Sequence, residues 1–114
     1  MSEGSYREIA GLFHLLSHPA RLRILDEVRR EEACVCHLQA VLKRPQAYVS
    51  QQLRLLREAG LVVDHKDGLN VYYRLADPQA GRLLEAVLGP AGRPTRPLGC
   101  PCPHCLGAGC PGPR

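Results

Sequence analysis

One stretch, residues 44–60, constrains the fold of this chain more than any other part of the sequence. Pro45 suits the first turn of a helix, where a missing N–H does no harm, and Gly60 suits the position just after a helix, where positive φ is favoured. The apolar residues between them recur at helical spacing and must face a core, namely Val49, Leu53 and Leu56. The sequence therefore predicts one amphipathic helix here.

The opposite face of this predicted helix is polar and rich in hydrogen-bonding groups. It comprises Ala47, Ser50, Gln51 and Arg54, with Gln46 and Tyr48 at its edge. Ser and Gln side chains donate to and accept from base edges, and an arginine lies one turn later, so this face suits the major groove of DNA. A polar helix face is more often simply solvated, so the interpretation depends on the flanking segments.

The segments on both sides of this helix favour a DNA-binding unit. Residues 35–42 form a shorter apolar-patterned helix joined to the long one by only residues 43–44, which predicts a helix-turn-helix. Residues 61–65 and 70–75 are β-prone, and the Asp-Gly pair between them is a strong hairpin signal. A hairpin directly after a recognition helix is a wing, in which we expect Lys66 to contact phosphate.

Three further helices complete the predicted domain. Residues 6–16 carry an apolar stripe wide enough to include a dimer surface, residues 1–5 look disordered, and Ser17 is a plausible cap for a helix ending near Glu31. Asp77 before Pro78 starts the last helix, which ends near Leu88. The arginines of the second helix are expected to be exposed: Arg21, Arg23, Arg29 and Arg30.

The predicted fold class is α+β, mainly α: a winged helix-turn-helix of about five helices plus a β-hairpin wing. It occupies residues 6–88 as a DNA-binding and dimerisation domain. Residues 89–114 are rich in Pro, Gly and Cys, and we expect a flexible linker followed by a metal-binding tail. No run of apolar residues is long enough for a membrane span and no signal peptide is visible, so we expect a cytoplasmic protein.

In order and spacing, these motifs resemble the ArsR/SmtB family of winged-helix, metal-responsive bacterial repressors. The resemblance is carried by residues 16–25, 34–38 and 48–62, and by the hairpin that ends with residues 71–75. It implies a homodimer whose last helix pairs with the first helix across the dimer. It also implies that the protein binds double-stranded operator DNA and is released by a metal or metalloid.

Six cysteines fall into two clusters, Cys34 and Cys36 at one place and Cys100, Cys102, Cys105 and Cys110 at the other. In a reducing compartment, clustered thiols are more often metal ligands or redox sensors than a disulfide framework. Two cysteines at i and i+2 cannot share an ion inside a helix. At a helix N-terminus their sulfurs can converge, and the helix dipole favours the thiolates that bind metal. Two small buried side chains are the alternative interpretation.

The Cys34-Val-Cys36 stretch resembles the arsenite, cadmium or lead site of the family, which a third thiol completes. The third arsenic-binding cysteine of some members falls at Gln39 here, the N-terminal arm contains no thiol, and the last helix lacks the histidine of the family's zinc site. We therefore expect the tail cysteines, with His104 as a possible substitute, to complete a site for arsenite, Cd²⁺, Pb²⁺ or Zn²⁺. Alternatively, the tail binds its own Zn²⁺. His37 and His65 are interpreted as polar surface residues without a metal role.

The function predicted from the sequence is thus a transcriptional repressor released from its operator by a thiophilic metal or metalloid. A redox-responsive repressor switched by cysteine oxidation is the first alternative. A cysteine-rich metal buffer or chaperone is an alternative of a different class, but it leaves the helix-turn-helix and the wing without a purpose. No catalytic constellation is visible, so we do not expect an enzyme.

Overall fold

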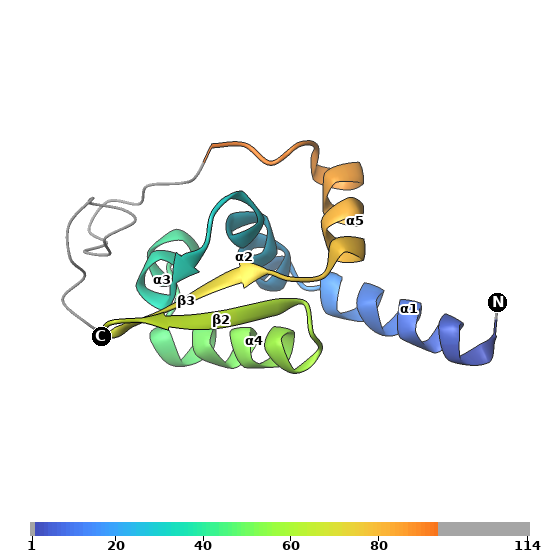
Figure 1. Cartoon of the computed structure of the whole chain (residues 1–114), viewed down its shortest axis with the longest axis horizontal. Helices are drawn as coiled ribbons and strands as arrows, with labels where there is room; N and C mark the ends of the chain where they lie inside the picture. The colour runs from blue at the N-terminus through green and yellow to red at the C-terminus, as the bar shows by residue number, and fades with distance from the viewer. Residues whose placement is uncertain (1, 94–114) are drawn as a thin grey trace.

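The computed structural model describes residues 2–93, which form five helices and a three-stranded antiparallel sheet (Figure 1). The predicted winged helix-turn-helix is confirmed. The tail cysteines and His104 lie outside the described residues, so their role as ligands stays a prediction. The elements, in chain order, are α1 (Glu3–Leu16), α2 (Pro19–Arg30), β1 (Ala33–Cys34), α3 (Val35–Leu42), α4 (Gln46–Glu58), β2 (Val62–Asp67), β3 (Asn70–Leu75) and α5 (Pro78–Leu88).

The first helix begins earlier than the sequence suggested. The Ser2 hydroxyl accepts a hydrogen bond from the Ser5 N–H at 3.2 Å, and Glu3 places a negative charge in the first turn. Both features stabilise a helix N-terminus. The expectation that residues 1–5 are disordered is therefore wrong for residues 2–5.

The junction between α1 and α2 also differs from the prediction. Ser17 does not cap α2, because its hydroxyl donates to the carbonyl oxygen of His14 at 2.6 Å, at the end of α1. The N-cap of α2 is His18, whose Nδ1 accepts from the Ala20 N–H at 3.2 Å. Serine is a common N-cap residue and histidine an uncommon one, so the sequence alone favours Ser17.

The core is assembled where α2, α3 and α4 meet the sheet. The side chains of Val49, Leu53 and Leu56 are fully buried, which confirms the apolar face predicted for α4. Gly60, just after α4, has a φ of 80°, as predicted for a residue that ends a helix. Asp77 caps α5 by accepting from the Gln79 N–H at 2.9 Å.

The sheet has the strand order β1-β3-β2, so the wing strand β3 is central. β1 is only two residues long and was not predicted, since two residues carry no alternation pattern. It pairs with β3 at Cys34 opposite Tyr72, and β2 pairs with β3 at His65 opposite Tyr72. The hairpin of β2 and β3 is thereby fixed to the segment that carries the first cysteine.

The arginines of α2 are not all exposed, contrary to the expectation. Arg23 is 53% exposed at its side chain, but Arg29 is only 6% exposed. Arg29 donates to Asp26 Oδ1 at 2.8 Å and to the carbonyl oxygen of Gly89 at 2.8 Å. The chain at and after the end of α5 thus contacts α2 through the carbonyl oxygens of Gly89 and Arg93, which accept from Arg29 and Arg30.

Candidate nucleic-acid interface and thiol site

The polar face that is predicted to bind DNA lies on the outer side of α4. The opposite, apolar face of the same helix is buried in the core. All four of its residues are exposed and line one surface depression of about 340 Å³: Ala47, Ser50, Gln51 and Arg54. Gln46 is the first residue of the helix and is also exposed, and Tyr48 is half-buried against the core. Pro45 is the N-cap residue and not, as predicted, part of the first turn.

The turn between α3 and α4 depends on one left-handed residue. Lys43 has a φ of 56° and its N–H donates to the carbonyl oxygen of Gln39 at 2.8 Å, which ends α3. The Arg44 guanidinium lies 5.4 Å from the centre of the Tyr48 ring, within the range of a cation–π contact. Two basic residues therefore immediately precede the N-cap of α4.

Arg21 connects the end of α1 to α4, a contact that no local sequence pattern indicates. Its Nε donates to the carbonyl oxygen of Leu15 at 2.8 Å, and one of its terminal nitrogens lies 3.4 Å from Oε1 of Gln52. Gln52 is buried on the inner side of α4. The orientation of the polar face is thus tied to α1 as well as to the apolar core.

The wing is a tight hairpin whose tip faces solvent. Gly68 has a φ of 66° at the turn, and both Lys66 and Leu69 are exposed. Near the base of the wing, Arg57 of α4 forms an ion pair with Asp64 of β2 at 3.2 Å. The wing and α4 therefore lie together on one side of the domain (Figure 1).

The two cysteines at the start of α3 converge, as expected for a pair that straddles a helix boundary. Cys34 ends β1 with extended φ and ψ and is the N-cap of α3, where its Sγ accepts from the His37 N–H at 3.4 Å. The Sγ atoms of Cys34 and Cys36 are 2.8 Å apart. Cys34 is buried and Cys36 is partly exposed.

His37 is not a surface residue, and this part of the prediction is wrong. Its side chain is 5% exposed, and its Nε2 lies 3.3 Å from Oε1 of Glu27, which is also buried. Glu27 further pairs with Arg23 at 3.3 Å. The signal for this pair was a glutamate within the buried stripe of α2, between Ile24 and Val28, but the sequence did not identify its partner. His65 does lie at the surface of the wing, with Nδ1 3.3 Å from Glu32.

Cys34 and Cys36 are not joined by other potential metal ligands among the described residues. Within residues 2–93, no group of three or more His, Cys, Asp or Glu side chains is arranged to hold a metal ion. Two thiolates fill two of the four coordination positions of a tetrahedral ion such as Zn²⁺. The structure thus brings the sulfurs of Cys34 and Cys36 together.

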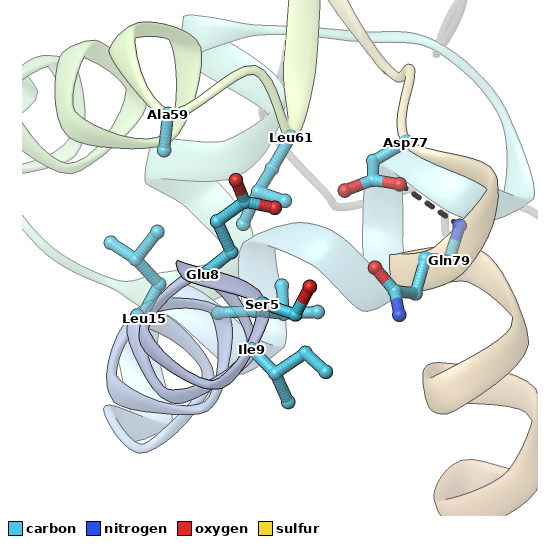
Figure 2. Close-up of a pocket in the computed structure, with 10 residues that line it drawn as sticks. Ser5, Glu8, Ile9, Leu15, Ala59, Leu61, Asp77 and Gln79 are labelled. Atoms are coloured by element: carbon cyan, nitrogen blue, oxygen red, sulfur yellow. Dashed lines mark hydrogen bonds between the residues drawn. The ribbon is translucent and has the colours of Figure 1, made fainter. Parts of the chain in front are cut away.

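A second surface feature lies between α1 and α5. A groove of about 550 Å³ is lined on one side by Glu8, Ile9 and Leu15 of α1 and on the other by Leu61, Asp77 and Gln79 (Figure 2). Large apolar side chains are exposed on the same two helices: Tyr6 at 58%, Phe13 at 54%, Val87 at 72% and Leu88 at 47%. Exposed apolar side chains clustered on two helices are typical of a protein–protein contact.

Comparison with known proteins gives a consistent result. Residues 18–63 match the family model of the bacterial regulatory proteins of the arsR family. A transcriptional repressor SmtB homolog of Synechocystis sp. is 41% identical over 87 residues, which are 76% of this chain and 66% of that protein. The arsenic resistance transcriptional regulator ArsR1 of Pseudomonas putida is 38% identical over 75% of this chain and 69% of its own length. This chain therefore spans about two thirds of each of these two relatives.

The fold is also similar to that of solved structures. The solved structure of reduced HlyU from Vibrio cholerae superimposes with a TM-score of 0.72 at 28% identity, covering 75% of this chain and 90% of that one. The two proteins therefore share the fold over three quarters of this chain.

Proposed function

Because the chain belongs to the arsR family of bacterial regulatory proteins, we propose that it is a homodimeric transcriptional repressor that a thiophilic metal or metalloid releases from operator DNA. The two sequence relatives are regulators of transcription and not enzymes, in agreement with the expectation from sequence. The observation that carries the proposal is the convergence of the Cys34 and Cys36 sulfurs at the first helix of the helix-turn-helix.

The DNA-binding surface in this proposal is the polar face of α4 together with the wing. Ser50, Gln51 and Arg54 would read base edges in the major groove, with Gln46, Ala47 and Tyr48 beside them. Lys66 on the wing would contact phosphate, which positions the protein without reading sequence. Support comes from the shared exposure of the α4 residues over one depression and from the rigid core that holds them.

Replacing Gln51 with alanine is expected to weaken binding to a specific duplex by about 1–3 kcal/mol, because a hydrogen-bonding side chain is lost from base readout. Binding to random DNA should hardly change. Fluorescence anisotropy with a duplex selected from a random library, at fixed salt, measures both. Glu58→Ala, at the exposed C-terminal end of the same helix, is the control. An equal loss of affinity on both DNAs would remove Gln51 from base readout.

The dimer in this proposal uses the apolar surfaces of α1 and α5. A second copy would cover the exposed Tyr6, Phe13, Val87 and Leu88 side chains and occupy the groove between the two helices. Two recognition helices would then enter successive major grooves, about 34 Å apart on a near-palindromic site. Burial at a dimer interface also helps a domain of this size, for which a single core is small.

The effector in this proposal is arsenite, Cd²⁺, Pb²⁺ or Zn²⁺, bound by Cys34 and Cys36. Soft thiolate ligands select such ions over Mg²⁺ or Ca²⁺. The remaining ligands are proposed to be tail cysteines, namely Cys100, Cys102, Cys105 and Cys110, with His104 as a possible substitute. A titration of the DNA complex with the four ions side by side under reducing conditions tests the proposal. Metal binding by a chain that binds no duplex would instead indicate a metal buffer.

Deleting residues 99–114 should weaken metal binding at the Cys34 and Cys36 thiols by at least tenfold, because two thiolates alone leave the ion's remaining positions to water. Dimerisation and DNA affinity should hardly change. A competition titration with a chromophoric chelator measures the affinity. A full-length chain with the four tail cysteines changed to serine separates the thiols from the rest of the tail. An unchanged metal affinity in both variants would contradict the role given to the tail.

Oxidation is a second candidate signal, favoured by the 2.8 Å separation of the two Sγ atoms. A hydroperoxide would take two electrons from the two thiols. One S–S bond would form while the O–O bond breaks, and the two thiol protons would end in water and the alcohol. A disulfide needs the sulfurs at about 2.05 Å and a Cβ–S–S–Cβ dihedral angle of about 90°. Release of DNA by peroxide, reversed by a dithiol reductant, would favour this signal over metal.

A further inference from the structure

Gln52 is a polar residue on the buried side of α4. Its side chain is 7% exposed, and it lies one turn after Val49 and directly before Leu53, both of which are fully buried. Its other chain neighbour, Gln51, is exposed on the face that is proposed to read DNA. A buried amide without a hydrogen-bond partner is costly, so a glutamine at this position needs one. Arg21 supplies it, because its Nη1 donates to Oε1 of Gln52 at 3.4 Å.

The same guanidinium holds the end of α1. Arg21 lies in the first turn of α2, and its Nε donates to the carbonyl oxygen of Leu15 at 2.8 Å. Its Nη2 donates to the carbonyl oxygen of His14 at 3.5 Å. A positive charge is favourable beside the last carbonyl groups of a helix. Because the guanidinium is planar and rigid, its donors fix their acceptors on α1 and α4 relative to each other.

The two helices that Arg21 joins have different tasks in the proposed dimer. The exposed Tyr6 and Phe13 of α1 belong to the proposed contact with the second copy, and the first turns of α1 extend away from the rest of the domain (Figure 1). The outer face of α4 is proposed to read base edges. The orientation of α4 relative to α1 therefore sets the distance and the angle between the two recognition helices of a dimer.

The geometry of DNA makes this orientation matter. Half-sites about 34 Å apart place each recognition helix about 17 Å from the two-fold axis. At that radius, a rotation of about 5° moves the helix by about 1.5 Å. Hydrogen bonds to base edges tolerate a range of only about 0.5 Å in length. A small change in the angle between α1 and α4 is thus enough to break base contacts at one or both half-sites.

We propose that Arg21 and Gln52 are positioning residues that fix the half-site spacing accepted by the dimer; this inference rests on the function proposed above. Apolar packing holds helices together but is non-directional. A hydrogen bond weakens when its distance or angle departs from the optimum, so it restricts orientation. The bond from Arg21 to Gln52 holds α4 in its DNA-reading orientation before DNA arrives, which lowers the cost of ordering on binding.

The test compares three duplexes by fluorescence anisotropy at fixed salt. The first is a two-half-site operator selected from a random library by the full chain. The second is one isolated half-site of that operator. The third carries one additional base pair between the half-sites, which adds about 3.4 Å of separation and about 35° of rotation. The parent protein should bind the selected operator more tightly than the other two duplexes.

Gln52→Met keeps the length of the side chain but removes the acceptor, and it leaves the contacts of Arg21 with α1 intact. Affinity for the selected operator should fall about fivefold, the factor expected for one net hydrogen bond, and affinities for the half-site and the lengthened operator should stay within about twofold. The preference for the selected spacing should therefore fall about fivefold. Gln52→Glu, which keeps an acceptor for Arg21, should retain this preference. Gln51→Ala should instead weaken binding to the operator and to the half-site alike.

Arg21→Lys is a second variant that cuts the link from its other end. It keeps the positive charge beside the end of α1 but lacks the rigid set of donors that reaches Gln52. We expect it to lose spacing preference as Gln52→Met does. The double variant should lose no more than either single variant, because both changes remove the same link. Urea denaturation of each variant reports its stability separately from its DNA preference.

Three results would overturn the inference. The first is an unchanged spacing preference in both Gln52→Met and Arg21→Lys. The second is an equal loss of affinity for operator and half-site, which would limit the two residues to a role in the stability of the fold. The third is the same loss of preference in Gln52→Met and Gln52→Glu, since the acceptor would then be irrelevant. Failure of the parent chain to dimerise or to select any duplex would instead refute the proposed function itself.

Discussion

Replacing Cys34 or Cys36 with serine should abolish release from DNA by metal while leaving DNA affinity without metal nearly unchanged. The serine hydroxyl is a poor ligand for soft ions, so either change removes half of the paired thiols. At position 34 serine also preserves the N-cap of α3. Its oxygen can accept the hydrogen bond that the His37 N–H now donates to the Cys34 sulfur. Effector couplings in regulatory proteins are typically about 1–3 kcal/mol, so the expected loss is a factor of about 5–150 in the metal effect on DNA affinity.

Anisotropy titrations of the DNA complex, with and without metal, measure this ratio for each variant. Ser50→Ala is the opposite control, since it lies on the DNA-facing side of α4 and should alter DNA affinity without changing metal binding. If the serine variants are released from DNA at the same metal concentration as the parent, Cys34 and Cys36 are not the site through which metal acts. Loss of DNA binding in metal-free serine variants would show that the cysteines act as core residues.

Leu53→Ala should reduce the free energy of unfolding by about 2–5 kcal/mol, the range for truncating a buried leucine. Leu53 is fully buried beneath the DNA-facing side of α4, so the loss also loosens the anchor of that helix. Urea denaturation at fixed protein concentration measures the change. Arg54→Ala, one residue further on the exposed side, should stay within about 0.5 kcal/mol of the parent. Similar stabilities for the two variants would contradict the assignment of the core face of α4.

Local patterns explain why so much of the fold was predictable. The spacing of Val49, Leu53 and Leu56, the glycine after the helix and the Asp-Gly turn each depend on residues a few positions apart, and each proved correct in the structure. Cys34 and Cys36 were placed at a helix boundary by the same kind of argument.

The features that were missed depend on contacts between distant segments. Glu27 and His37 are buried only because α2 and α3 bring them together, and each residue alone is typical of a surface. Arg29 is buried by the chain that leaves α5, through its bond to Gly89. The packing of Tyr72 on Cys34 follows from the register of β1, a strand too short to be recognised in sequence.

The measurement that tests the central claim most directly is the affinity of the reduced full chain for Cd²⁺ and for arsenite, with and without saturating operator DNA. If metal at Cys34 and Cys36 releases the repressor, linkage requires that DNA weakens metal binding by the same factor by which metal weakens DNA binding. We predict that the two factors are equal and that each is a weakening of about 5-fold to 150-fold. Both should disappear in Cys34→Ser. Equal metal affinities with and without DNA would contradict the account.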